Sequence, residues 1–295
     1  MKLIIGSHVG FVKATGLLGS VQETLSYGAN TFMFYTGGNQ TTERSEIDPD
    51  LTYKAHELMK EKGIDKNDLV IHAPFIINLA NDSDKRKWDF YVEFLSKELS
   101  RCELLGVNKM VLHPGSSVTV ERNHALEMIS KGLDIALEKH PHMMILLEYM
   151  SGKGTECGKS IDELKTIYDA CARKEQLGIC LDTCHISDSG VDLNKFDEFL
   201  DEFDSKIGID KIKCIHINDS MNVLGSHKDR HANIGYGNIG FDTLINIIYN
   251  ERLGSIPRIL ETPYMNRNTK DAVAPYKEEI EMIRNKKFED FKKEA

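Results

Sequence analysis

The residues with the clearest capacity for chemistry lie in the segment 212–240. His216 closes a short apolar run there, and Asp229 and His231 follow in a glycine-containing loop. Side chains at positions i and i+2 of an extended backbone share a face, so Asp229 and His231 can point at one ion. Imidazole and carboxylate groups both bind zinc, at about 2.0–2.2 Å. The segment therefore predicts a metal site, and a polar loop with a hydrogen-bonded histidine is the alternative.

Residues of the same kinds close most other apolar segments. Of the eight strands predicted below, seven end in His, Asp or Glu: His8, His72, His113, Glu148, Asp182, His216 and Glu261. Taken alone, each could cap a turn or form a hydrogen bond. Several buried carboxylates without partners are costly, however, and divalent cations are the natural compensation. The candidate ligands are too many for one four-coordinate zinc and predict two or three ions, with a carboxylate bridging a pair: His72, His113, Glu148, Asp182, His185, His216, Asp229, His231 and Glu261.

Alternating strands and helices must position these side chains. Strands are predicted at 2–8, 31–35, 69–72, 109–113, 144–148, 177–182, 212–217 and 258–261. Helices are predicted at 19–27, 51–62, 84–105, 121–139, 160–172, 193–203, 241–252 and 271–288. Eight such units predict a single (β/α)8 TIM barrel domain over residues 1–295, with the active site at the carboxyl-terminal rim of the strands. An open doubly wound sheet is the alternative.

Composition narrows the class of protein. The 295 residues are 41% hydrophobic and 28% charged, as in ordinary globular proteins, and no apolar run approaches a membrane span. Six scattered cysteines indicate reduced thiols, which favours a cytoplasmic location, and we expect a monomer. The net charge of −9 argues against a polyanionic partner. Three divalent ions, with two charges each, would change it from −9 to −3.

Nine short motifs, in order along nearly the whole chain, resemble those of the endonuclease IV family of abasic-site endonucleases. They are GSH (6–8), INL (77–79), HPG (113–115), LE (147–148), LDTCH (181–185), HINDS (216–220), DRH (229–231), GNIG (237–240) and ETP (261–263). LDTCH together with HIND, DRH and GNIG is highly specific, whereas HPG or ETP alone would be weak.

The resemblance implies a barrel that carries three zinc ions. One would be held by His72, His113 and Glu148, and a second by Glu148, Asp182, His216 and Glu261. The third would be held by His185, Asp229 and His231, and manganese or iron could replace zinc at such ligands.

The implied reaction is hydrolysis of the phosphodiester 5′ to an abasic site in duplex DNA, a step of base excision repair. It leaves a 3′-hydroxyl and a 5′-deoxyribose phosphate, and Glu261 and Glu148 are the expected catalytic residues. Removal of 3′-blocking groups is a further activity that such a site could support.

Contacts to DNA are expected from the rim. The family inserts an aromatic–aliphatic pair and an arginine at the lesion; here the pair is Phe75 and Ile76, and Gln40 occupies the arginine position with Arg44 nearby. Packing at the rim is the alternative role for Phe75 and Ile76. The other expected contacts are His8, Lys228 and Arg230, with Lys153 and Lys159 in the loop after Glu148.

Two other functions compete with this interpretation. A metal-dependent sugar isomerase or epimerase of the same barrel superfamily would have no evident use for a separate trio of His185, Asp229 and His231. A metal-dependent DNA-binding or zinc-storage protein is disfavoured because the set of ligands is intact.

Overall fold

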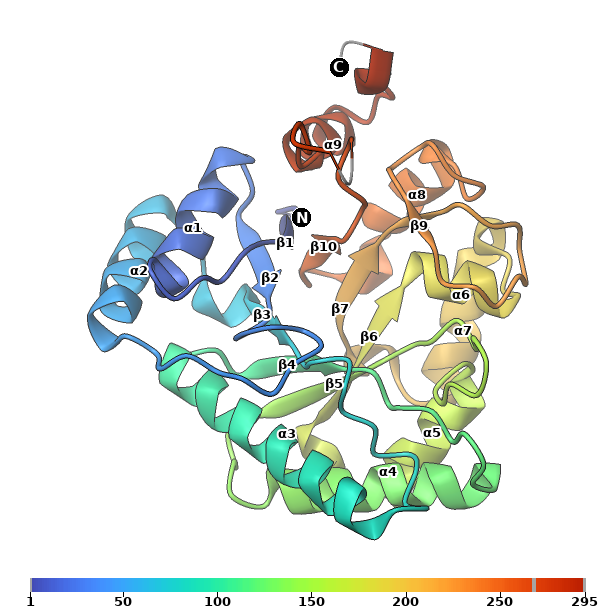
Figure 1. Ribbon diagram of the computed structural model, residues 1–295. Coiled ribbons are helices and arrows are strands. Elements are labelled where there is room, and N and C mark those ends of the chain that lie inside the picture. Colours follow the sequence, from blue (N-terminus) through green and yellow to red (C-terminus); the bar gives the residue numbers. More distant parts are fainter. Residues whose placement is uncertain (1, 267–268, 294–295) are drawn as a thin grey trace.

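The computed structural model describes residues 2–266 and 269–293. Eight parallel strands close into a barrel in the order β1-β10-β7-β6-β5-β4-β3-β2, which confirms the predicted architecture and excludes the open sheet (Figure 1). The barrel strands are β1 (Ile5–His8), β2 (Thr31–Phe34), β3 (Val70–His72), β4 (Lys109–Leu112), β5 (Met144–Glu148), β6 (Leu177–Asp182), β7 (Ile212–Ile217) and β10 (Arg258–Leu260).

Helices surround this barrel (Figure 1). They are α1 (Gly16–Ser26), α2 (Pro49–Lys62), α3 (Lys85–Leu105), α4 (Arg122–Leu137), α5 (Ile161–Ala170), α6 (Thr183–Ser189), α7 (Phe196–Lys206), α8 (Phe241–Ile248) and α9 (Tyr276–Asn285). Two short strands, β8 (Asp219–Ser220) and β9 (His231–Ala232), pair antiparallel outside the barrel.

The interior of the barrel is packed in layers, because alternate residues of each strand point inward. One inward layer forms an apolar cluster of Met33, Val70, Val111, Leu146, Cys180, Cys214 and Ile259. The residue two positions further along each strand is polar and belongs to the next layer: Tyr35, His72, His113, Glu148, Asp182, His216 and Glu261. Six of the nine candidate ligands therefore lie directly above an apolar layer of the core.

Helix ends follow local chemistry. Asp84 caps α3 by accepting from the backbone N–H groups of Arg86 and Lys87. The last helix begins later than predicted, at Tyr276 rather than at 271, because a helix that began at 271 would have Pro275 beyond its first turn, where its missing N–H and its ring are not tolerated. The predicted helix at 193–203 is instead a 3-10 turn (Leu193–Lys195) followed by α7, and α6 is an additional helix that begins directly after β6.

Two further expectations concern the environment of the chain. All six cysteines are buried and carry free thiols, as the prediction of reduced thiols requires. Among the described residues, no helix combines the length and apolarity that crossing a membrane demands.

Candidate metal centre

Glu148 lies at the centre of the candidate site, at the end of β5 and 1% exposed. Its Oε2 atom lies 3.2 Å from His72 Nε2 and 3.1 Å from His113 Nε2. Its Oε1 atom faces the opposite way, 3.1 Å from His216 Nδ1. One carboxylate thus faces two groups of imidazoles at once, which is the geometry of a bridging ligand.

His216 gathers the second group of side chains. Its Nδ1 atom is 3.0 Å from Glu261 Oε2 and 3.8 Å from Asp182 Oδ2. Ligand atoms of Glu148, Asp182, His216 and Glu261 all lie within 4.8 Å of one another, as do those of His72, His113 and Glu148. These two sets are the ones that the resemblance implies for the first two ions.

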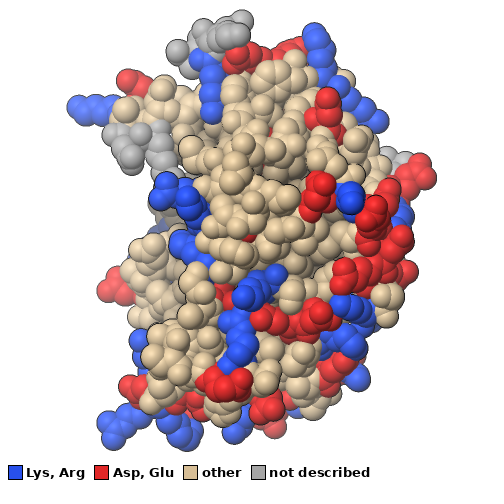
Figure 2. All heavy atoms as spheres, turned by 90° about the vertical axis from the view of Figure 1, so that its right-hand side faces the viewer, with Lys and Arg blue, Asp and Glu red and all other residues tan. Residues whose placement is uncertain are grey.

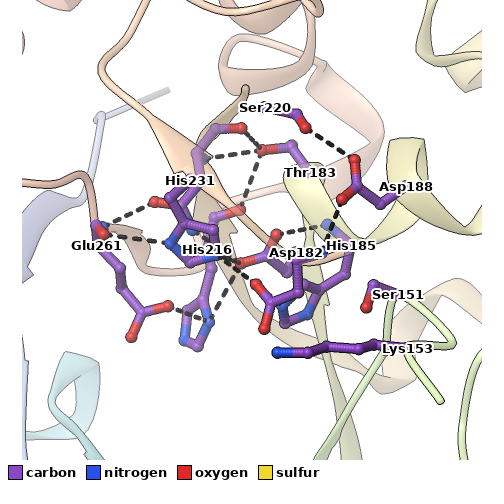
Figure 3. Close-up of polar contacts among 12 residues, drawn as sticks. Ser151, Lys153, Asp182, Thr183, His185, Asp188, His216, Ser220, His231 and Glu261 are labelled. Carbon is purple, nitrogen blue, oxygen red and sulfur yellow. Dashed lines mark hydrogen bonds and ion pairs between the residues drawn. The ribbon is translucent and has the colours of Figure 1, made fainter. Parts of the chain in front are cut away.

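The third group comes from three different segments. His185, on α6, places Nε2 3.1 Å from Asp229 Oδ1, and His231, on β9, places Nε2 3.4 Å from the same oxygen. His231 Nε2 also lies 3.7 Å from Asp182 Oδ2, so the third group adjoins the second (Figure 3). The structure therefore brings all nine predicted ligands to one rim.

Hydrogen bonds to backbone carbonyl groups orient three of the histidines. The Nδ1 atoms of His72, His185 and His231 lie 2.7, 3.0 and 3.2 Å from the carbonyl oxygens of Ala73, Tyr149 and Glu261. An Nδ1–H that donates there leaves the Nε2 lone pair free to face the site, as is usual for histidines that bind metals.

The spacing of these atoms suits divalent cations. Bonds of about 2.0–2.1 Å in a tetrahedral zinc site place neighbouring ligand atoms roughly 3.3 Å apart. The ligand pairs described above are separated by 3.0–3.8 Å. The donors are imidazole nitrogens and carboxylate oxygens, which zinc, manganese and iron accept. The first two sets therefore fit the ions that the resemblance implies. Around the third, the groups whose donor atoms all lie within 4.8 Å of one another are Asp182, His185 and His231, and Cys184, Asp229 and His231, so Asp182 lies as close to the two histidines as a ligand would.

Electrostatics keeps the carboxylates ionised. Burial alone would raise the pKa of Glu148, but the imidazoles of His113 and His216 hold that pKa well below its usual range. Burial likewise opposes ionisation of Asp229, yet His185 and His231 lower its pKa to about 2. Against the effect of burial, the same carboxylates raise the pKa of His113, His185 and His216. Metal ligands must be deprotonated, so a cation that binds here would displace protons from these imidazoles.

A second set of buried polar residues, which the sequence did not single out, holds the ligands in place. Asn218 donates from Nδ2 to Asp182 Oδ2 at 2.8 Å and accepts from the backbone N–H of Glu261 at 2.9 Å. Thr183 Oγ1 accepts from the backbone N–H of Asn218 at 2.8 Å. Thr183 lies in the LDTCH motif and Asn218 in the HINDS motif. Their polar side chains, close in sequence to predicted ligands, are the feature from which a supporting role could have been predicted.

Asp219 fixes the loop that leads to α8. Its carboxylate accepts hydrogen bonds from the backbone N–H groups of Ser220, Gly235, Gly237 and Ile239 at 2.8–3.1 Å. A Cβ atom at Gly237 would lie 2.4 Å from Asp219 Oδ1, so the close approach of backbone to carboxylate requires glycine there. The GNIG motif is thus explained by structure rather than by direct chemistry.

Phe75 stands at the mouth of the site. It is 45% exposed, and its ring centroid lies 5.0 Å from that of His113 and 5.6 Å from that of Tyr35. It borders two hollows, one also lined by His113 and Asp229, the other also lined by His8 and Glu261. Ile76 is partly buried behind it. An exposed position at the rim is what a side chain inserted into DNA at the lesion would need.

The loop between β2 and α2 carries the exposed Gln40 and touches Phe75, whose backbone N–H donates to the carbonyl oxygen of Asn39 at 2.9 Å. Arg44 of this loop does not face the site. Its Nε atom lies 2.6 Å from Oε1 of the buried Glu98, so Arg44 anchors the loop on α3 and is not free to contact DNA.

Basic side chains lie close to the candidate ligands. Lys228 and Arg230 are the sequence neighbours of Asp229, and Lys153 extends toward the ligands (Figure 3). On the flank of the molecule drawn in Figure 2, a broad uncharged area is bordered by separate groups of cationic and anionic side chains. His8 adds little charge, because burial lowers its pKa to about 4.

Comparisons with known proteins agree with this geometry. The family described as xylose isomerase-like TIM barrel matches residues 21–286. "Probable endonuclease 4" of Mycoplasma capricolum is 46% identical over 288 residues, which cover 97% of this chain and 98% of that protein. The crystal structure of endonuclease IV from Thermus thermophilus superimposes with a TM-score of 0.80 at 26% identity, covering 99% of both chains. A D-tagatose 3-epimerase-like protein shares the fold, with a TM-score of 0.65 at 21% identity and coverage of 96% and 98%.

Proposed function

Because the chain belongs to the endonuclease IV family within the xylose isomerase-like TIM barrels, we propose that it is a metal-dependent DNA endonuclease acting at abasic sites. Its substrate is duplex DNA with an abasic nucleotide, and the bond cleaved is the phosphodiester 5′ to that nucleotide. We further propose a single barrel domain that works as a monomer in the cytoplasm.

The observation that carries the proposal is the third group of ligands. His185, Asp229 and His231 adjoin a site whose other two groups share Glu148. Phosphodiester hydrolysis needs both the attacking and the leaving oxygen to be stabilised, which a cluster of cations does. Epimerisation of a free sugar has no comparable need, and the relative that is 46% identical is named an endonuclease.

Zinc ions bound to these nine residues would lower the pKa of water and stabilise negative charge on phosphate oxygens. The chain's own contribution is placement. Glu148 and Glu261 come from β5 and the end of β10, and only Glu261 retains appreciable exposure, 16% against 1%. Glu261 is therefore the carboxylate that can orient a nucleophilic water or take its proton. Asn218, bonded to the backbone of Glu261, fixes its direction.

Phe75, Ile76 and Gln40 would occupy the gap at the lesion, while Lys228 and Arg230 would contact phosphates of the DNA backbone. An abasic nucleotide has no base to unstack, which reduces the cost of turning it into the hollow beside His8 and Glu261. Phosphate contacts position a duplex without reading its sequence, so we expect no sequence preference.

The direct test is incision of a duplex that contains one tetrahydrofuran residue. Protein reconstituted with zinc should cut that strand once, 5′ to the analogue, and leave an undamaged duplex intact. Failure to cut under zinc, manganese or iron, together with turnover of a ketohexose, would favour the epimerase instead.

A further inference from the structure

Asp188 is a buried carboxylate that the proposed reaction does not use. It lies on α6, three residues after His185, and is fully buried. No described Lys or Arg side chain forms an ion pair with it. Its carboxylate is therefore stabilised by hydrogen bonds alone. Burying a carboxylate without a cationic partner is costly, which indicates that the residue has a role in the structure.

All of its side-chain hydrogen-bond partners belong to one segment, the loop from Ser220 to Asp229. Oδ1 accepts from Ser220 Oγ at 2.7 Å (Figure 3). Oδ2 accepts from Asn222 Nδ2 at 3.0 Å and from the backbone N–H of Asp229 at 2.8 Å. The backbone carbonyl group of Asp188 also accepts from the N–H of His227 at 2.9 Å. One residue of α6 thus holds both ends of the loop.

The backbone held in this way is strained. Asp229 has φ +54° and His227 has φ +52°, a left-handed conformation that is uncommon outside glycine, although Asp and His adopt it more often than most residues. In this conformation the backbone N–H of Asp229 donates to Asp188. That conformation directs the Asp229 carboxylate to within 3.1 Å of His185 Nε2 and 3.4 Å of His231 Nε2.

We propose that Asp188 is a positioning residue for the third cation. It preorganises Asp229 opposite His185, so that α6 supplies one ligand directly and fixes a second through the loop. The inference rests on the proposed function, because it assumes that the third group binds a metal. It predicts that loss of Asp188 weakens one ion selectively, while the ions at Glu148 remain.

The test compares Asp188→Ala and Asp188→Asn with the control Asp134→Ala. Asp134, on α4, also accepts three hydrogen bonds from a neighbouring segment, namely from Cys171 Sγ and the N–H groups of Ala172 and Arg173. That segment precedes β6 and therefore lies at the other end of the barrel from the ligands. The control removes an equal number of loop bonds where no ligand is held.

Two measurements decide the proposal. Amide hydrogen exchange over 226–231 is measured in chelator-treated protein. Relative to wild type, it should be faster in Asp188→Ala and the same in Asp134→Ala. Zinc bound at buffered free concentrations should fall from three to two ions per chain in Asp188→Ala, with roughly a 10- to 100-fold loss of affinity for one ion. Asp188→Asn keeps an oxygen for the N–H of Asp229 but loses the charge, so it should lie between wild type and Asp188→Ala in both measurements.

Folded Asp188→Ala that retains every ion with unchanged affinity would overturn the proposal. If Asp188→Ala does not fold, Asp188→Asn with wild-type exchange and wild-type affinity would overturn it equally. Wild-type protein that binds neither zinc, manganese nor iron would refute the proposed function, and the exchange comparison would still show whether Asp188 holds the loop.

Discussion

Glu279 offers a quantitative test of how the rim loops are held. This carboxyl on α9 is fully buried and accepts hydrogen bonds from Asn233 Nδ2, the N–H of Ile234 and Thr262 Oγ1. Burial raises its pKa from 4.5 to about 7, although these hydrogen bonds and the charge of Lys292 act in the opposite direction. A tenfold change in proton affinity corresponds to about 1.36 kcal/mol, so ionising Glu279 costs the folded state roughly 3 kcal/mol.

The sign of the effect follows from linkage. The folded protein binds this proton more tightly than the unfolded chain, so the contribution of Glu279 to stability is complete below pH 4.5 and is lost as pH rises through about 7. Glu279→Gln mimics the protonated form, since its amide oxygen can accept and its NH2 group can donate to Thr262. We expect the variant to be more stable than wild type near pH 8, by up to roughly 3 kcal/mol, and similar to it near pH 5.

Urea denaturation of zinc-saturated protein at the two pH values measures this difference. Glu98→Gln is the matched control, because Glu98 is equally buried but is paired with Arg44. Removing that partner leaves a cation unpaired, so the control should be destabilised at both pH values. A Glu279→Gln variant that is less stable than wild type near pH 8, with an unchanged pH profile, would refute the reasoning.

Three further predictions concern activity. Glu261→Gln should still bind abasic duplex in a gel-shift assay yet lose most incision; near wild-type cutting would contradict its role. Because Asp182 and His216 are fully buried, brief exposure to a weak chelator should leave incision intact, and prolonged treatment with a strong chelator should abolish it. Incision by protein freed of metal would contradict metal dependence. Phe75→Ala should weaken binding to abasic duplex roughly 5- to 150-fold, the equivalent of about 1–3 kcal/mol of stacking, while Phe75→Tyr should retain it. Equal affinity of the alanine variant would assign Phe75 to packing.

The barrel and the gathering of ligands followed from one sequence pattern. In a barrel with parallel strands, every strand end meets the same rim, so the recurrence of polar residues after apolar runs predicted a shared layer. His72, Glu148 and Asp182 needed no long-range information beyond the number of strands. Their neighbours two positions earlier, such as Val70 and Leu146, belong to the separate apolar cluster inside the barrel, which confirms the inward orientation.

The supporting contacts could not be predicted in the same way, because they depend on tertiary structure. Helix α6 begins immediately after β6, where a loop is more usual. The burial of Asp188 on this helix is explained only by its hydrogen bonds to the loop from Ser220 to Asp229. Arg44 is close in sequence to the position expected to contact DNA, yet its partner, Glu98, is 54 residues away on α3. In contrast, the later start of the last helix could be predicted from the sequence, because Pro275 excludes a helix that begins at 271.

The central claim is that nine side chains at one rim hold a cluster of cations. Anomalous diffraction from crystals at the zinc absorption edge tests this claim most directly. We predict three peaks: one beside His72 and His113, one beside His216 and Glu261, and one between His185 and His231, with Glu148 between the first two. A zinc-saturated crystal with no peak at this rim, or with its peaks at the other end of the barrel, would contradict it.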